Sequence, residues 1–168
     1  MKKRLQAGFT LGETLVTVAL LGIVFSSLTG GLIAASRVYR DVTEKANAQV
    51  LLSTAIMEVT NDLKNADAST YSATDYSFTT SARGYSIRYT NDATNGLTAE
   101  PYPNTDDKMQ SIPLVTKKAG TENLTVNIED GSAGLTYDSV NKVFKCTIVI
   151  YGTSGELESQ DIYVRPNE

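Results

Sequence analysis

The chain has 168 residues, and its 19 acidic side chains outnumber its 15 basic ones, giving a formal net charge of −4. This balance argues against non-specific nucleic-acid binding, which needs lysine and arginine to displace counterions. The sequence has no histidine, so it offers no imidazole base, no histidine-containing triad and no histidine-ligated metal. We therefore expect neither an enzyme nor a cofactor or metal site.

The first element in the chain is a long apolar stretch behind a basic start. Lys2, Lys3 and Arg4 open the sequence, and the only charged side chain between Leu5 and Ser36 is Glu13. As a helix, the apolar run Leu15–Ala35 would be roughly 31 Å long, enough to cross a bilayer core of about 30 Å. The basic flank predicts a cytoplasmic N-terminus. The sequence thus predicts one membrane-spanning helix with a carboxylate near its start.

Two ordinary explanations of this stretch leave the carboxylate unexplained. A secretory signal peptide would be cut near Ala34-Ala35-Ser36, and a plain anchor would not be cut at all. In either case, inserting a carboxylate such as Glu13 into the membrane costs on the order of 2.5–3.5 kcal/mol at mid-helix and less near the end of the helix. A third explanation is local, because Thr10-Leu11-Gly12-Glu13 fits the capping-box pattern that satisfies free amides of a first helical turn.

The segment GFTLGETLVTVALLGIV, Gly8 to Val24, resembles the N-terminal signal of type IV pilins and of the pseudopilins of type II secretion and competence systems. The matching features are a short basic leader ending in Gly, then Phe and Thr-Leu, a Glu four residues after the Phe, and an unbroken apolar run. The resemblance is specific over these residues and extends only in pattern to about Ala68.

The resemblance implies a role for each of three residues. Residues 1–8 would be a leader that a membrane-embedded prepilin peptidase cuts between Gly8 and Phe9, and the same enzyme would methylate the new amine of Phe9. Glu13 would be kept for assembly, neutralising the N-terminal amine of a neighbouring pilin or pseudopilin subunit. An unpaired charge in a low-dielectric core costs several kcal/mol, and pairing recovers much of that. Capping by Thr10 is compatible with this role.

The resemblance also implies where the protein is found. The precursor would lie in the cytoplasmic membrane with residues 9–35 as its transmembrane and assembly half. After processing, the inner-membrane assembly platform would move the helix out of the lipid and into an extracellular filament. Many Gram-negative pilins carry a C-terminal disulfide. The single cysteine excludes an intramolecular one and so favours a Gram-positive source.

Beyond Arg37 the pattern becomes amphipathic, and residues 36–68 predict a helical spine. Apolar residues recur at steps of three or four along one face: Leu52, Ile56, Val59, Leu63 and Ala66, with Val38, Val42 and Ala46 as a weaker beginning. Charged and amide residues stay off this stripe, namely Glu44, Asn47, Asn61, Asp62 and Lys64. We expect one helix from about Thr10 to about Ala66. The stretch from Met57 to Ala66 is similar to the end of the spine in J-type minor pseudopilins.

Residues 69–168 predict a β-rich globular domain, because alternation with a period of two replaces the helical stripe. The expected strands lie at Tyr85–Tyr89, Ile112–Thr116, Leu124–Ile128, Leu135–Tyr137, Val143–Tyr151 and Leu157–Val164. Residues Asn91 to Met109 contain two prolines and read as a long loop. Cys146 alternates with Phe144, Ile148 and Ile150 and is expected to be buried. The predicted fold class is α+β, one long helix packed on an antiparallel sheet.

These features predict a minor pilin, a structural subunit that acts by assembly. The polar, irregular domain and the spine pattern favour a minor over a major pilin. Two other functions stay open: a filament-tip adhesin that uses the loop Asn91–Met109, and a membrane-anchored sensor domain that needs no cleavage after Gly8.

Overall fold

A computed structural model describes residues 10–103, 110–116, 121 and 123–167. The chain divides into two compact units between Val42 and Thr43. One helix, α1 (Leu11–Lys64), supplies the first unit and opens the second. The expected end of this helix, about Ala66, lies two residues further on. Ala66 instead begins the first strand, and its side chain is buried in the core.

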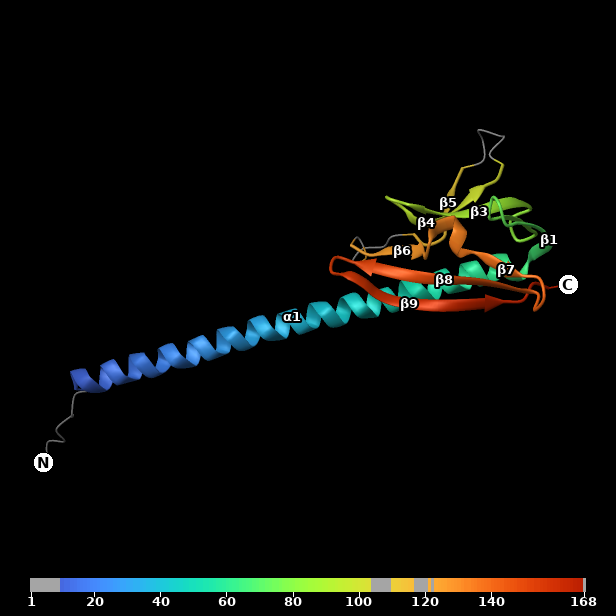
Figure 1. The fold of residues 1–168 in the computed structure, drawn as a ribbon. Coiled ribbons are helices and arrows are strands. Elements are labelled where there is room, and N and C mark those ends of the chain that lie inside the picture. Colours follow the sequence, from blue (N-terminus) through green and yellow to red (C-terminus); the bar gives the residue numbers. More distant parts are fainter. Residues whose placement is uncertain (1–9, 104–109, 117–120, 122, 168) are drawn as a thin grey trace, which may run out of the picture. The chain divides into compact units, whose positions relative to one another are not determined.

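The second unit holds two antiparallel sheets and a short 3₁₀ helix (Figure 1). The first sheet has the strand order β1-β2-β3-β4-β5, formed in succession by Ala66–Ser72, Ser77–Thr80, Tyr85–Asp92, Gly96–Pro101 and Ile112–Pro113. The second sheet is built on β8 (Val143–Gly152), which pairs with β6 (Thr125–Ile128), β7 (Thr136–Asp138) and β9 (Gly155–Val164). The 3₁₀ helix, η1 (Gly131–Gly134), lies between β6 and β7.

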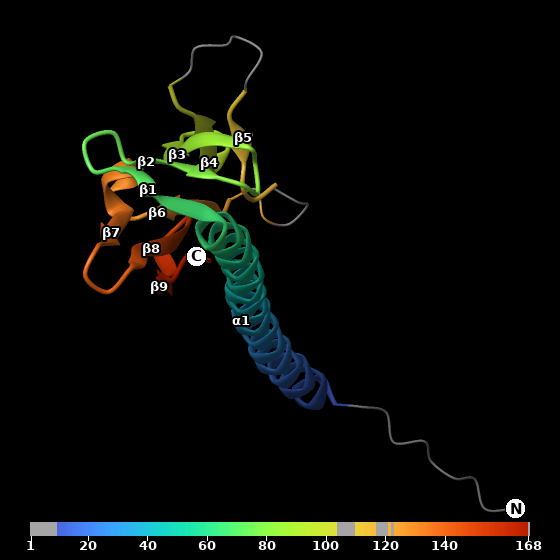
Figure 2. The same cartoon turned by 90° about the vertical axis from the view of Figure 1, so that its right-hand side faces the viewer.

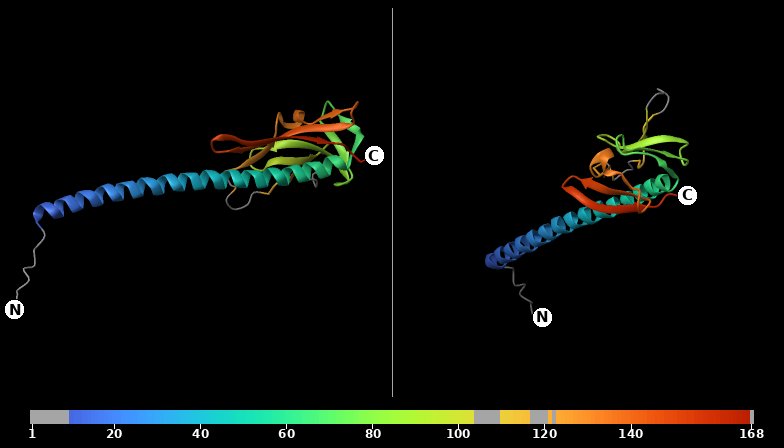
Figure 3. Two further views of the ribbon diagram at one scale, coloured as in Figure 1. Left: turned by 90° about the horizontal axis from the view of Figure 1, so that it is seen from below. Right: turned by 45° about the vertical axis from the view of Figure 1, so that its right-hand side comes forward.

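Both sheets and the C-terminal part of α1 enclose one core. Figure 2 separates the β2–β4 and β7–β9 layers, and both views of Figure 3 show β8 and β9 alongside this part of α1. Phe78 of the first sheet packs on Phe144 of the second with ring centroids 5.7 Å apart. Asn91 joins the sheets through its side chain, donating to the carbonyl of Ile128 (2.7 Å) and accepting from its amide (2.9 Å). The predicted α+β architecture, a helix packed on antiparallel sheet, is confirmed.

The apolar spacing predicts the core face of the helix only in part: Val59, Leu63 and Ala66 of the expected stripe are buried, but the rest of the face is rotated from it. Ala48, Leu51, Ala55, Val59 and Leu63 are buried, whereas Leu52 and Ile56 are only half-buried at the edge of the interface. Val38, Val42 and Ala46, expected to begin the core stripe, are exposed. The reason is steric: the small side chains of Ala48 and Ala55 let the sheets approach the helix closely, which larger residues would prevent.

The prediction of a long loop at Asn91–Met109 is wrong for the first half of that range. Strand β3 continues to Asp92, and β4 pairs with it from Gly96 to Pro101. Gly96 makes the turn possible because its φ of 73° is unfavourable for other residues. Pro101 is tolerated because it is the last residue of its strand. Residues 104–109, also part of the predicted loop, lie outside the described residues.

The strands predicted from alternation are otherwise found, with shifted ends. Strands β3, β6, β7, β8 and β9 match their expected positions, and β5 is limited to Ile112–Pro113. The turn Asp138–Asn141 between β7 and β8 is held by the Asp138 carboxylate, which accepts the amides of Val140 (2.9 Å) and Asn141 (3.1 Å). Cys146 is buried, as expected, and burial raises the pKa of its thiol to about 12.

Candidate functional site

The start of α1 is a closed capping box. Thr10 donates its backbone amide to Oε2 of Glu13 at 2.9 Å and its hydroxyl to the same oxygen at 3.0 Å. The Glu13 amide is 3.4 Å from Oγ1 of Thr10 in return. The capping interpretation of these two residues is thus confirmed. Gly8 and Phe9, the other two predicted site residues, lie outside the described residues.

The box uses only one oxygen of the carboxylate. Among the residues that the structure describes, the Glu13 side chain accepts hydrogen bonds through Oε2, and Oε1 has no hydrogen-bond partner there. The side chain is also exposed. A carboxylate can accept several hydrogen bonds, so Glu13 can cap its own helix and still accept a donor from another molecule.

The helix that follows the box is apolar on all sides and exposed. Its large side chains in the first unit are exposed, and the helix is long and apolar enough to cross a membrane. Three of its hydroxyl groups bond back to the helix: those of Thr17, Ser27 and Thr29 donate to the carbonyls of residues 13, 23 and 25 at 2.7–3.0 Å. No polar group of these three residues therefore needs water.

A buried ion pair fastens the end of α1 to the first sheet. Asp62 is 2% exposed, and Arg83, in the turn between β2 and β3, donates to both of its carboxylate oxygens at 2.8–3.0 Å. The hydroxyl of Tyr89 donates to the same carboxylate at 3.2 Å. The expectation that Asp62 stays off the core face is wrong. The buried charge of Asp62 is tolerated because Arg83 neutralises it. The two residues are 21 positions apart in the sequence and meet only in the folded domain.

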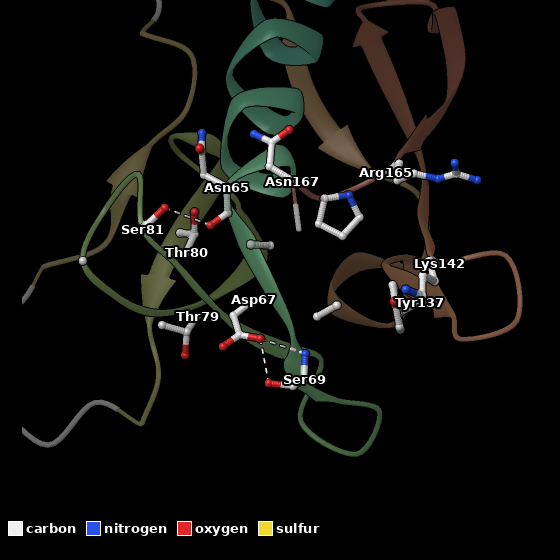
Figure 4. A pocket seen from close by; sticks show the side chains of 14 residues that line it. Asn65, Asp67, Ser69, Thr79, Thr80, Ser81, Tyr137, Lys142, Arg165 and Asn167 are labelled. Carbon is white, nitrogen blue, oxygen red and sulfur yellow. Dashed lines mark hydrogen bonds between the residues drawn. The ribbon is translucent and has the colours of Figure 1, made fainter.

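A pocket of about 680 Å³ lies where α1 passes into β1. Figure 4 shows Asn65, Thr80 and Ser81 on one side of it and Tyr137, Lys142 and Arg165 on the other. The only carboxylate among its described lining residues is Asp67. That carboxylate accepts both the amide (3.0 Å) and the hydroxyl (2.6 Å) of Ser69, and these bonds lower its pKa. The lining thus offers hydrogen-bonding groups of both signs of charge.

Among the described residues, no group of three or more His, Cys, Asp or Glu side chains lies close enough to hold a metal ion. The turn at Glu129–Gly131 leads directly into η1, with Asp130 in the left-handed region at φ 57°. Its carboxylates therefore belong to a structural turn.

Comparison of the chain with protein families, with curated protein sequences and with solved structures gives no match. The functional assignment accordingly depends on the residues of the chain itself. The N-terminal site combines two of them that the structure describes, Thr10 and Glu13, with an exposed apolar helix.

Proposed function

We propose that the chain is a minor pilin, a structural subunit of a type IV filament or of a related secretion or competence filament. Prepilin peptidase cuts the precursor between Gly8 and Phe9 and methylates Phe9. The processed subunit then leaves the cytoplasmic membrane through the inner-membrane assembly platform and joins other pilin subunits through α1. The observation that carries the proposal is a single carboxylate, Glu13, four residues after Phe9 at the start of an exposed apolar segment of α1 that has no other charged residue before Arg37.

The geometry of Glu13 supports the assembly step. A filament core of packed apolar helices has a low dielectric constant, where the N-terminal amine of an incoming subunit needs a counter-charge. Oε1 of Glu13 is available for that amine while Oε2 keeps the helix capped. The hydroxyls of Thr17, Ser27 and Thr29 are satisfied within the helix, so exchanging lipid for protein contacts breaks none of their hydrogen bonds.

Mass spectrometry of the N-terminal peptide, from protein purified out of native membranes or filaments, tests the processing step. We expect a peptide that starts at Phe9 and carries one added methyl group. An intact leader in cells with active prepilin peptidase, or a cut near Ser36, would contradict the proposal and return Glu13 to a purely capping role.

Substitution of Glu13→Gln tests the assembly step separately. The amide keeps the size of the side chain and an oxygen that can accept Thr10, but it removes the charge. We expect normal processing at Phe9 and at least a tenfold loss of the subunit from sheared filaments, because a buried unpaired amine costs several kcal/mol. Thr17→Ala, one turn further along, is the matched control and should assemble normally. Equal incorporation of both variants would refute the role of Glu13.

The abundance of the chain in sheared filaments separates a minor from a major pilin, since a major pilin would dominate the preparation. The adhesin alternative gains no support from the described residues, because β4 occupies part of the loop on which it depended. A membrane-anchored sensor would keep residues 1–8, which the mass measurement detects.

A further inference from the structure

The pocket at the C-terminal end of α1 is one part of a larger hollow surface. A second hollow of about 560 Å³ adjoins it, because both are lined by Lys142, Arg165, Pro166 and Asn167. We name the two hollows together the tail groove, since three of the shared residues belong to the segment that follows β9. Ligand sites in proteins commonly have volumes of about 300–1,000 Å³. The tail groove is therefore large enough for a ligand of more than one ring.

Arg165 lines both hollows and makes little use of its charge within the fold. Its guanidinium donates to the Asn141 carbonyl at 3.4 Å. Arg83 and Arg88 each pair with a carboxylate, whereas Arg165 pairs with none among the residues that the structure describes. A guanidinium can bind a carboxylate through two parallel hydrogen bonds. Lys142 lies on the same side of the pocket (Figure 4) and is exposed. This side of the groove therefore favours an anionic group.

The opposite side presents oxygen atoms without a donor. Oδ1 of Asp67 accepts the amide and hydroxyl of Ser69, but Oδ2 has no hydrogen-bond partner among the described residues. Nδ2 of Asn65 donates to the Asn61 carbonyl at 2.8 Å, and its Oδ1 is likewise without a described partner. The side-chain amide of Asn167 offers both a donor and an acceptor. A ligand that satisfies all of these groups must donate and accept, as hydroxyl groups do.

Tyr137 and Pro166 add apolar surface beside the cations. Tyr137 packs on the buried Phe144 with ring centroids 4.7 Å apart and lines the pocket with the rest of its half-exposed surface. None of the described residues that line the larger hollow is a leucine, isoleucine, valine or methionine. Peptide partners usually depend on large side chains that fill apolar pockets. This lining instead suits a ring with an apolar face and a polar edge.

We propose that the tail groove binds an acidic saccharide, a short chain of sugar rings of which at least one carries a carboxylate. The carboxylate pairs with Arg165 and Lys142, and the hydroxyls of a neighbouring ring bond to Asp67 and Asn65. The C–H face of a ring lies on Tyr137. A saccharide satisfies both sides of the groove because each of its hydroxyls donates and accepts.

This proposal is independent of the other two functions considered. The groove contains no residue of the loop Asn91–Met109 among its described lining residues, so it is a different surface from that of the loop-based adhesin. All its residues belong to the second unit. Binding therefore requires no cut at Phe9, and failure of either proposal leaves the other standing.

Titration of the full, isotope-labelled chain in detergent micelles, followed by nuclear magnetic resonance, tests the site. The probes are two acidic saccharides, a galacturonate trimer and a hyaluronan tetrasaccharide. We expect at least one of them to give saturable amide shifts, with a dissociation constant on the order of a millimolar or tighter. The shifts should be confined to the groove: Asn65, Asp67, Ser69, Tyr137, Lys142, Arg165 and Asn167.

Two control ligands separate charge from hydroxyl recognition. A neutral galactose trimer lacks the carboxylates and should bind about tenfold more weakly or less than the best acidic probe. A glutamate tripeptide carries carboxylates but no sugar hydroxyls and should also bind about tenfold more weakly or less.

Two substitutions on the exposed surface keep the result decisive. Arg165→Gln removes the charge and should weaken binding of the acidic probe about tenfold or more, while Lys45→Gln, on α1 outside the groove, should leave it unchanged. Asn167→Ala should weaken binding about threefold or more, and Asn123→Ala is its matched control. These side chains are all exposed, so the spectra without sugar should match that of the wild type outside the substituted positions.

Three results would each overturn the proposal. The first is no saturable shift with either acidic saccharide. The second is binding of the glutamate tripeptide as tight as that of the acidic saccharide, which would assign the groove to acidic peptides. The third is equal weakening by Arg165→Gln and Lys45→Gln, because that would show attraction by the overall charge without a site.

Discussion

The Thr10–Glu13 pair caps α1 through one carboxylate oxygen of Glu13, and in the proposed function the other oxygen would bind a neighbouring subunit. The hydroxyl and amide of Thr10 occupy Oε2 of Glu13, which fixes the carboxylate at the start of α1. Its orientation is therefore set within the subunit, before any neighbour arrives. Pre-organisation of this kind reduces the entropy lost when the second donor binds.

Removing the Thr10 hydroxyl should loosen the start of α1. Thr10→Val deletes one donor to Glu13 and one acceptor of its amide, a capping loss of about 1 kcal/mol. Hydrogen exchange of the Glu13 and Thr14 amides, measured on the protein in detergent micelles, should speed up about fivefold. Thr10→Ser keeps the hydroxyl and should exchange like the wild type. Identical exchange in the two variants would mean that the box contributes nothing to the helix start.

Tyr89 should make stability depend on pH at the alkaline end. Burial raises the pKa of Tyr89 well above its ordinary value of 10.0, and the nearby charge of Asp62 raises it further. The unfolded chain ionises this tyrosine near pH 10 while the folded chain keeps it neutral. Its contribution is therefore complete below pH 10 and is lost as the pH rises above that value.

The matching substitution is Tyr89→Phe, which removes the ionising group. At pH 7 it should lower the free energy of unfolding by about 1 kcal/mol, through the lost hydrogen bond to Asp62. Above pH 10 its free energy of unfolding should fall less steeply than that of the wild type. Denaturant titrations between pH 7 and 11 measure both effects, and parallel curves over that range would refute the assignment.

At the scale of elements, Asp62 and Arg83 join α1 to the turn between β2 and β3. The neighbouring backbone strengthens the joint, since the Thr80 hydroxyl donates to the Asp62 carbonyl at 2.8 Å and the Ser81 amide to the Asn65 carbonyl at 2.9 Å. The last turn of the helix is thus fixed to the first sheet by both side-chain and main-chain contacts.

Breaking the ion pair from one side should be costly. Asp62→Ala leaves the largely buried Arg83 without its partner, and we expect a loss of about 3 kcal/mol or more in the free energy of unfolding. Asn61→Ala, the exposed neighbour, should cost less than about 0.5 kcal/mol. The double variant Asp62→Leu/Arg83→Met should recover part of the loss because no charge is left unpaired. Chemical denaturation followed by circular dichroism measures the free energy of unfolding of all three variants. A loss of less than about 1 kcal/mol in Asp62→Ala would show that water screens the ion pair.

The sequence predicts some elements well because their burial alternates. Strand β6 has alternate residues buried, and the Phe144–Ile150 face of β8 points into the core. Strand β4 escapes prediction because four successive residues, Gly96 to Ala99, are buried, so no alternation marks it. Strand β1 has mostly exposed or half-buried polar residues and gives no signal. The burial of Asp62 is equally invisible, since its partner lies 21 residues away.

Some features of the N-terminal helix can likewise be predicted from the sequence, and others cannot. Gly8, Phe9 and Glu13 follow from a local motif, and the Thr10–Glu13 box follows from a four-residue spacing. The exposure of Val42 and Ala46 does not follow from the sequence, because a helix with apolar residues on two opposite faces has no single stripe. The apolar spacing predicts both residues on the core face, whereas the structure has them exposed.

At the scale of the whole folded unit, the two sheets lie close together at Gly96. A Cβ atom there would lie 2.7 Å from the Val126 carbonyl oxygen and 3.3 Å from its nitrogen. Gly84 has a similar φ, +77° against +73°, but nothing within 4 Å of such an atom. The two glycines thus separate backbone strain from contact between β4 and β6.

Gly96→Ala should destabilise the protein more than Gly84→Ala. In both variants, an alanine with a positive φ lowers the free energy of unfolding by about 1 kcal/mol or more. Only in Gly96→Ala must the new methyl group also push β4 away from β6. We expect a further loss of about 1–3 kcal/mol in the free energy of unfolding, as for overpacked cores. Thermal unfolding of the two variants side by side gives the difference. Equal losses would mean that the sheets separate freely at this point.

The order of strand pairing has a consequence for how quickly the domain folds. Among the described strands, every pair joins neighbours in the chain except β6 and β8, which are separated only by η1 and the short β7. Pairings between neighbours close short loops and are favoured kinetically. Each sheet can therefore form progressively as its strands leave the ribosome. The core face of α1 is synthesised before every strand, and β9 is synthesised last. This face of α1 is therefore the part of the core that stays exposed for the longest time during synthesis.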